Sequence, residues 1–174
     1  MSKALQIKVT LSDINPPIWR RILVKDDITL FLLSHIIQSC LDWDNSHMHE
    51  FTVNGMSIES GAERNIKISD LKLKTKSKIE YLYDFGDNWY HIIEIEKRSP
   101  IDTKQLYPFC IKAARACPPE DCGGSYGYVH LLDILEYGDK NSIEYEEQME
   151  WIGEDFDPER ANLKEINENI QERL

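Results

Sequence analysis

The sequence predicts an α+β protein: a mainly antiparallel, roll-like sheet with one long packed helix, followed by a helical C-terminal third. Three patterns indicate this fold class. In the first 97 residues, several short segments alternate apolar with polar residues, which is the period of strands. A single segment among them, 26–43, has helical spacing instead. From residue 126 onward helical spacing recurs without further alternation.

The 174 residues fit a single domain, or one domain with a small helical appendage. We divide it into a sheet-plus-helix part (1–97), a Cys- and Pro-rich loop (98–125) and a helical C-terminal part (126–174). A chain of this length buries enough surface to fold without a disulfide or a structural metal.

The first two strands are predicted on either side of a proline pair. Leu5, Ile7, Val9 and Leu11 alternate with polar residues and predict a half-buried strand. The segment "IWRRILV" at 18–24 predicts a second strand with bulky residues on both faces. The two prolines in "INPP" between them cannot continue a ladder and predict a bend.

The clearest helix is "DDITLFLLSHIIQSCLDW", since its apolar residues recur at helical spacing. Either Asp27 or Thr29 can cap it, because both side chains offer an oxygen to a free first-turn N–H. Cys40 lies on the apolar side and is predicted to be a core residue.

Two hairpin signals follow the helix. Asn54-Gly55 in "HEFTVNGMSIES" supplies the two positive-φ residues of a tight turn. The lysines of "LKLKTKSK" alternate with other residues and, in an extended segment, form one lysine face. That face is interpreted either as a protected, solvated sheet edge or as an anion-binding strip.

The second hairpin signal contains the tripeptide Asp84-Phe85-Gly86, which in protein kinases holds a catalytic magnesium ion. The chain has no glycine-rich phosphate loop and no His-Arg-Asp catalytic loop. Apolar residues alternate on both sides of the tripeptide, at 79–83 and 89–95. The tripeptide is therefore predicted to lie at a hairpin turn, where Gly86, Asp87 and Asn88 tolerate the required dihedrals.

Three helical segments are predicted after the loop. Gly138 is expected to end the first of them. Asn141 and Glu144 have the spacing of a capping box for the second. For the last, both Asp157-Pro158 and Asn162 are predicted starts.

Composition restricts the partners. The net charge of −11 repels the phosphate backbone, so nucleic acid is disfavoured unless a local basic patch overrides the average. No apolar run approaches the roughly 20 residues of a membrane span. The N-terminus has no signal-peptide core, and we therefore expect a cytoplasmic protein.

Five blocks of the chain together resemble one known family, the plasmid pRi open-reading-frame-three-like proteins. The blocks are "LSDINPPIWRRILV", "FLLSHIIQSCLDW", "HMHEF", "YLYDFGDNWYHIIEIEK" and "ACPPEDCGGSYGY". The resemblance implies a compact α+β, roll-like fold and no established activity. Some relatives carry labels such as transposon resolvase or repressor, but the arginine cluster that a serine resolvase needs is missing here.

The cysteines suggest zinc as the candidate cofactor. Cys110, Cys117 and Cys122 follow one another as C-x6-C-x4-C, which is looser than a zinc knuckle. A fourth ligand can come from His47, His49, His91 or His130. The alternative is that the three residues are semi-buried thiols in a loop stiffened by prolines.

The loop also carries the acidic pair Glu120 and Asp121, between two prolines and Gly123-Gly124. The functional interpretation is that the pair orients a cation or an amine, or shares a proton. The structural interpretation is that the carboxylates accept hydrogen bonds from free N–H groups at the start of the next helix.

A third set of candidates lies on the sheet: Asp84, Asp87, Trp89, His91, Trp19 and Arg20. Trp89 and His91 are two residues apart and share a strand face. A buried Arg20 needs a partner, and Asp84 is the expected carboxylate.

Three functions follow, in decreasing order of support: a non-catalytic module that binds a protein or peptide, a metal-dependent hydrolase or nuclease, and a DNA-binding protein of mobile elements. All of the candidate sites rest on one expectation, that the tryptophan-bearing hairpin and the Cys-rich loop meet in space.

Overall fold

The computed structural model describes residues 2–58 and 61–174. Its strands are β1 (Lys3–Leu11), β2 (Ile18–Lys25), β3 (His49–Val53), β4 (Met56–Ile58), β5 (Lys78–Tyr83), β6 (Trp89–Pro100) and β7 (Phe109–Ala114). Its helices are α1 (Leu30–Leu41), α2 (Gly124–Tyr137), α3 (Ile143–Ile152) and α4 (Leu163–Arg173), with short 3-10 turns at Ala62–Arg64 and Ile68–Leu71. The α+β prediction is confirmed.

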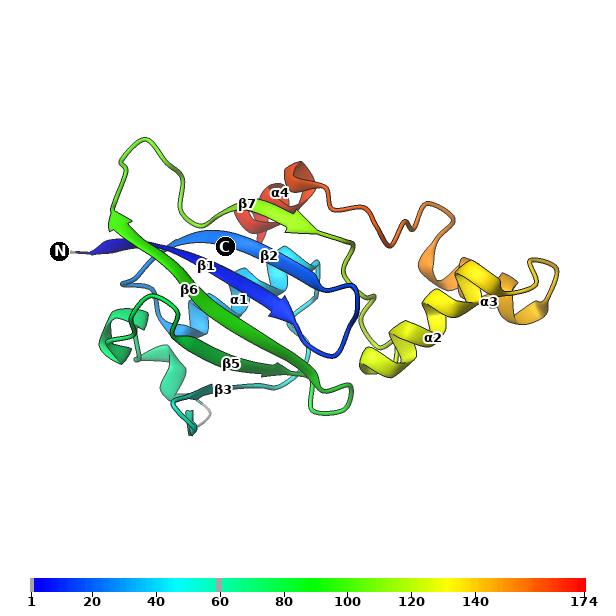
Figure 1. Ribbon diagram of the computed structural model, residues 1–174, viewed down its shortest axis with the longest axis horizontal. Helices are drawn as coiled ribbons and strands as arrows, with labels where there is room; N and C mark the ends of the chain where they lie inside the picture. Colours follow the sequence, from blue (N-terminus) through cyan, green and yellow to red (C-terminus); the bar gives the residue numbers. More distant parts are fainter. Residues whose placement is uncertain (1, 59–60) are drawn as a thin grey trace.

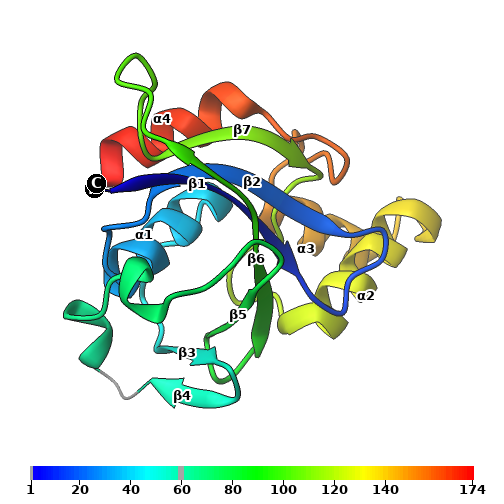
Figure 2. The same cartoon turned by 60° about the vertical axis from the view of Figure 1, so that its left-hand side comes forward.

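The strands form one open antiparallel sheet in the order β4-β3-β5-β6-β1-β2-β7. Helices α1 and α4 pack on the same face of this sheet, as Figures 1 and 2 show. Residues at alternate positions of the strands point to that face and are buried, among them Ile7, Ile22 and Ile93. The core therefore lies between the sheet and these two helices.

The opposite face of the sheet is turned to the viewer in Figure 1, and no helix of the described ranges runs across it. Trp19 lies on this face, with the cationic groups of Lys8, Arg21 and Lys112 5.1, 5.1 and 6.0 Å from its ring centre. Helices α2 and α3 extend beyond one end of the sheet (Figure 1). None of the helices in the described part of the chain is long and apolar enough to span a bilayer.

Local signals explain the elements that the sequence predicted well. Thr29, not Asp27, caps α1: its side-chain oxygen accepts a hydrogen bond from the Leu32 N–H. Asn54 and Gly55 both have positive φ, at 52° and 75°, and connect β3 to β4. The hairpin around Gly86 is formed by β5 and β6, so the kinase-like tripeptide is a turn. The last two residues of the first predicted hairpin segment, 59 and 60, lie outside the described residues.

Several boundary predictions are wrong. The lysine segment is not extended before Lys78, because Lys72 and Lys76 adopt left-handed conformations in turns, so its lysines do not form the single face of a strand. The stretch 98–125 is not one continuous loop, since it contains the end of β6 and the whole of β7. Strand β7 is short, and its six residues carry no clear alternation of apolar and polar residues.

The C-terminal helices are present, but two of their predicted starts are wrong. Ser142, not Asn141, caps α3 by accepting from the Tyr145 N–H. Asp157-Pro158 lies in a turn, and α4 begins after Asn162, whose side chain accepts from the Lys164 N–H. Gly138 ends α2 as predicted.

Candidate functional site

The Cys-rich loop folds back onto the β5–β6 hairpin and onto the segment that follows α1. The Tyr83 hydroxyl donates to Glu120 over 2.6 Å, and the Asp44 N–H donates to the same carboxylate over 2.7 Å. The Gly123 N–H donates to Asp87 over 3.2 Å. The expectation that hairpin and loop meet in space is therefore confirmed.

Close backbone contact at the start of α2 explains why glycine occupies position 124. A Cβ atom at Gly124 would lie 2.3 Å from the carbonyl oxygen of Asp87, and the residue has a φ of 69°. Only glycine avoids both the clash and the strained conformation. The loop and the hairpin are thus held in direct contact.

Glu120 and Asp121 do not form a proton-sharing pair, because they face different partners. Glu120 binds Tyr83 and Asp44, whereas an Asp121 oxygen lies 3.3 Å from His47 Nε2. Burial, followed by the contact with Glu120, raises the pKa of Tyr83 to about 12. Tyr83 therefore stays protonated and remains a hydrogen-bond donor to Glu120.

Trp43 is the residue around which these segments pack, and the sequence analysis did not single it out. Its indole N–H donates to the carbonyl of Pro118 over 2.9 Å, and its ring stacks on Tyr83 at 5.2 Å. The ring centre of Trp89 lies 5.4 Å away. Trp43 ends the apolar pattern of the long helix, which was the one signal that marked it.

Trp89 and His91 belong to this aromatic cluster and are buried, so neither faces solvent as a ligand-binding group. Burial lowers the pKa of His91 to about 4, which keeps the imidazole neutral at physiological pH. These two sequence-predicted site residues are core residues.

Arg20 is buried as expected, but its predicted pairing with Asp84 is wrong. The guanidinium donates to the backbone carbonyls of Cys40, Trp19 and Ala114 and to the sulfur of Cys117. Asp84 does not contact Arg20 and lies next to His47 instead. Arg20 thus binds backbone carbonyls in place of the expected carboxylate. No sequence pattern indicates such backbone partners.

The three predicted zinc ligands occupy separate positions. Cys110 lies beside the buried Cys40, Cys117 contacts Arg20, and Cys122 lies at the start of α2 near the Gly124 carbonyl. In the described ranges, the three sulfur atoms do not form a group with ligand atoms within 4.8 Å of one another. Desolvation, followed by the Asp87 charge, raises the pKa of Cys122 to about 12, so this thiol stays protonated.

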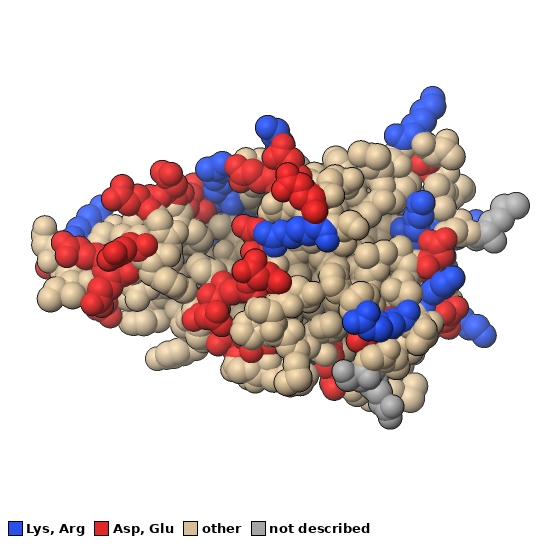
Figure 3. All heavy atoms as spheres, turned by 180° about the vertical axis from the view of Figure 1, so that it is seen from behind, with Lys and Arg blue, Asp and Glu red and all other residues tan. Residues whose placement is uncertain are grey.

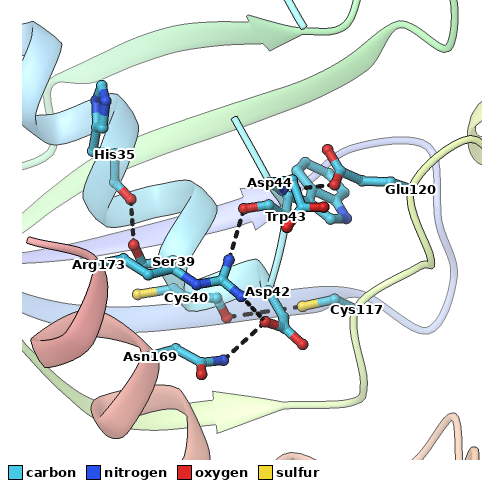
Figure 4. A network of polar contacts seen from close by, with 10 residues as sticks. All are labelled: His35, Ser39, Cys40, Asp42, Trp43, Asp44, Cys117, Glu120, Asn169 and Arg173. Carbon is cyan, nitrogen blue, oxygen red and sulfur yellow. Dashed lines mark hydrogen bonds and ion pairs between the residues drawn. The ribbon is translucent and has the colours of Figure 1, made fainter. Parts of the chain in front are cut away.

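A pocket of about 490 Å³ opens on the other side of the loop. Its walls are the C-terminal end of α1, the loop around Cys117–Glu120 and the segment 155–169 that leads into α4. Figure 4 shows part of this wall: Asp42 accepts from Asn169 and Arg173, and Arg173 also donates to the Trp43 carbonyl. The figure also shows the Cys117 sulfur in contact with the carbonyl of Cys40, another pair of pocket-lining residues.

The pocket lining is acidic. It contains two guanidinium groups, of Arg20 and Arg160, against five carboxylates, which belong to Asp42, Glu120, Asp155, Asp157 and Glu165. Both guanidinium groups are engaged within the protein: Arg160 pairs with Glu165, and Arg20 is only 2% exposed. Among the carboxylates, Asp42 pairs with Arg173 and Glu120 accepts from Tyr83. In the described part of the chain, Asp155 and Asp157 are therefore the lining carboxylates that neither pair with a cation nor accept from a tyrosine.

Comparison with known proteins identifies the relatives. The model of the plasmid pRiA4b ORF-3-like protein family matches residues 3–165. The chain belongs to this family. The resemblance found in the sequence blocks is thereby confirmed over nearly the whole chain.

Two relatives match this chain over most of its length. The "uncharacterized protein y4hQ" of Sinorhizobium fredii is 32% identical, over 99% of this chain and 93% of the relative. The crystal structure of the "protein of unknown function MM3350" of Methanosarcina mazei Go1 is 36% identical and superposes with a TM-score of 0.85. That match covers 94% of this chain and 97% of MM3350.

Three of the sequence blocks that indicated the family lie close together in the structure. "HMHEF" contributes His47, the "YDFGD" block contributes Asp84 and Asp87, and "CPPEDCGG" contributes Glu120 and Asp121. Blocks that are distant in the chain therefore meet at the loop.

Proposed function

We propose that this protein is a non-catalytic binding module whose acidic pocket accepts a cationic side chain, lysine or arginine, from a partner polypeptide. The observation that carries the proposal is the pocket at the C-terminal end of α1, with its excess of carboxylates. The C-terminal end of the α1 helix dipole also carries partial negative charge, which favours a cation.

The pocket also has apolar walls. Leu41, Trp43, Pro118, Phe156 and Ile166 line it beside the carboxylates. Lysine and arginine carry a positive head on an aliphatic stem, so one side chain can contact both kinds of wall. A phosphate backbone would be repelled by the same carboxylates, which weighs against nucleic acid as the ligand.

The wider surface supports a basic partner. Figure 3 shows Asp and Glu side chains crowded over the end of the molecule that carries α2 and α3 and continuing into its middle. Such a field attracts a positively charged chain and speeds its association. The acidic surface and the pocket therefore favour the same class of partner.

The test is NMR titration with a capped peptide that alternates lysine and leucine, with a glutamate-leucine peptide as the charge-reversed probe. We expect the lysine peptide to shift amide signals around the pocket, less so at high salt. The double variant Asp155→Asn/Asp157→Asn should weaken binding by about fivefold or more, because two pocket charges are lost.

The matched control is Asp133→Asn/Glu147→Gln, which removes the same charge from exposed positions on α2 and α3. It should bind the peptide as the unmodified protein does. Equal weakening in both double variants, or shifts spread evenly over the acidic surface, would show general charge attraction and refute the pocket.

A further inference from the structure

Three side chains from distant segments converge beside the Cys-rich loop, and none of them lines the pocket. His47 follows α1, Asp84 directly follows β5, and Asp121 lies in the Cys-rich loop. One ligand atom from each lies within 4.8 Å of the other two. His47 Nδ1 is 3.6 Å from an Asp84 oxygen, and Nε2 is 3.3 Å from an Asp121 oxygen.

Asp84 is a buried carboxylate without a strong cationic partner. The residue is only 8% exposed, and its Oδ1 accepts a hydrogen bond from the Gly86 N–H. Within the described ranges, Oδ2 accepts no hydrogen bond, and no Lys or Arg nitrogen lies within 4.0 Å of Asp84 or Asp121. A buried carboxylate is costly unless a cation compensates its charge.

Contacts with neighbouring residues set the positions of the three groups. The His47 ring packs edge-on against Tyr83, with 5.7 Å between ring centres. Tyr83 in turn holds Glu120, the neighbour of Asp121. The Asp84 backbone N–H donates to the carbonyl of Met48, next to His47. The cluster therefore belongs to the junction of loop and hairpin.

We propose that His47, Asp84 and Asp121 form a binding site for a divalent transition-metal cation such as Mn²⁺ or Zn²⁺. One imidazole nitrogen and two carboxylate oxygens are ligands that these ions accept. Three protein ligands leave further coordination positions for water or a bound molecule. A cation here compensates the buried charge of Asp84.

The site needs a small adjustment to close around an ion. Ligand atoms bonded to zinc at about 2.0–2.2 Å lie roughly 3–3.5 Å apart, closer than the 4.8 Å limit that describes this cluster. The Asp121 side chain is 74% exposed and can move toward the other two.

The first test uses Mn²⁺ alone as a paramagnetic NMR probe, because this ion avoids thiol ligands. At substoichiometric Mn²⁺, amide signals near His47, Asp84 and Asp121 should broaden first. The variants His47→Ala and Asp121→Asn should each abolish this selective broadening. Both positions are partly exposed, so the fold should persist, as an otherwise unchanged amide spectrum would show.

The control variants are His130→Ala, which removes an exposed histidine elsewhere, and Cys122→Ser, which removes the adjacent thiol. In both control variants, Mn²⁺ should broaden the same amide signals as in the unmodified protein. Calorimetric titration with Zn²⁺ should show one site per chain, with affinity at least about tenfold lower in the His47 and Asp121 variants.

Broadening elsewhere, or unchanged binding in the His47 and Asp121 variants, would overturn the site. The metal test is independent of the peptide test, since Asp155→Asn/Asp157→Asn should leave Mn²⁺ broadening unchanged.

Discussion

His91 illustrates how burial decides the chemistry of a single residue. It follows Trp89 on β6 and contacts the aromatic rings of Trp43 and Tyr81. In sequence it is a histidine beside aromatic and acidic residues, which is compatible with a titrating site. In the structure it is fully buried, and desolvation lowers its pKa to about 4.

This burial predicts a pH dependence of stability. The folded-state pKa lies below the unfolded value near 6.5, so the unfolded chain takes up a proton first as the pH falls. The contribution to stability is complete above pH ~6.5 and is lost between pH ~6.5 and ~4. A difference of about 2.5 pKa units corresponds to roughly 3 kcal/mol over the full range.

Urea unfolding at pH 7.5 and 5.0 checks this prediction. The loss of unfolding free energy between these values should be about 2 kcal/mol smaller in His91→Phe than in the unmodified protein, because phenylalanine does not titrate. The carboxylates contribute equally to the pH dependence of unfolding free energy in the two proteins, so their contribution cancels in the comparison. An identical pH dependence in the two proteins would contradict the role of His91.

At the scale of elements, the contact between α4 and the edge strand β7 protects the sheet. The Asn167 side chain accepts from the Cys110 N–H over 2.8 Å and donates to the Cys110 carbonyl over 2.9 Å. It thereby pairs both backbone groups of an edge residue as a neighbouring strand would. Unpaired edge groups are sites for association between chains.

We expect Asn167→Ala to destabilise the protein by about 1–3 kcal/mol, because it leaves two backbone groups without partners. Hydrogen exchange at the Cys110 amide should become faster. Gln171→Ala is the matched control, since Gln171 makes one longer contact, 3.4 Å, to the carbonyl of Pro108. Equal stability losses in the two variants would argue against the pairing.

At the scale of the whole molecule, stability is expected to be uneven. Helix α1 has nine buried residues and lies in the core, whereas α3 has none. Helix α3 lies beyond the end of the sheet, and its main packing partner is α2 (Figure 1). Elements with little buried apolar surface open more readily than the core.

Native-state hydrogen exchange should follow this order. Amides in α3 should exchange fastest among the helices, those in α2 at an intermediate rate and those in α1 slowest. Protection in α3 equal to that in α1 would show that the projecting part is as stable as the core.

The sequence predicted the elements much better than the contacts. The alternation of Leu5, Ile7, Val9 and Leu11 and the turn at Asn54-Gly55 were sufficient for strands and hairpins, because both depend on neighbouring residues. Strand β7 was missed since its six residues carry no clear alternation. The meeting of loop and hairpin was predicted, but the partner of Arg20 was not.

Sequence by itself thus determined the fold class, the family and most helices and strands, since periodicity and backbone preferences act over a few residues. Only the tertiary structure decided which polar groups share a site. His47, which the sequence offered as one of four histidines for a cysteine site, lies between Asp84 and Asp121 instead. Such contacts join residues far apart in the chain, and the packing of segments that places them leaves no local pattern in the sequence.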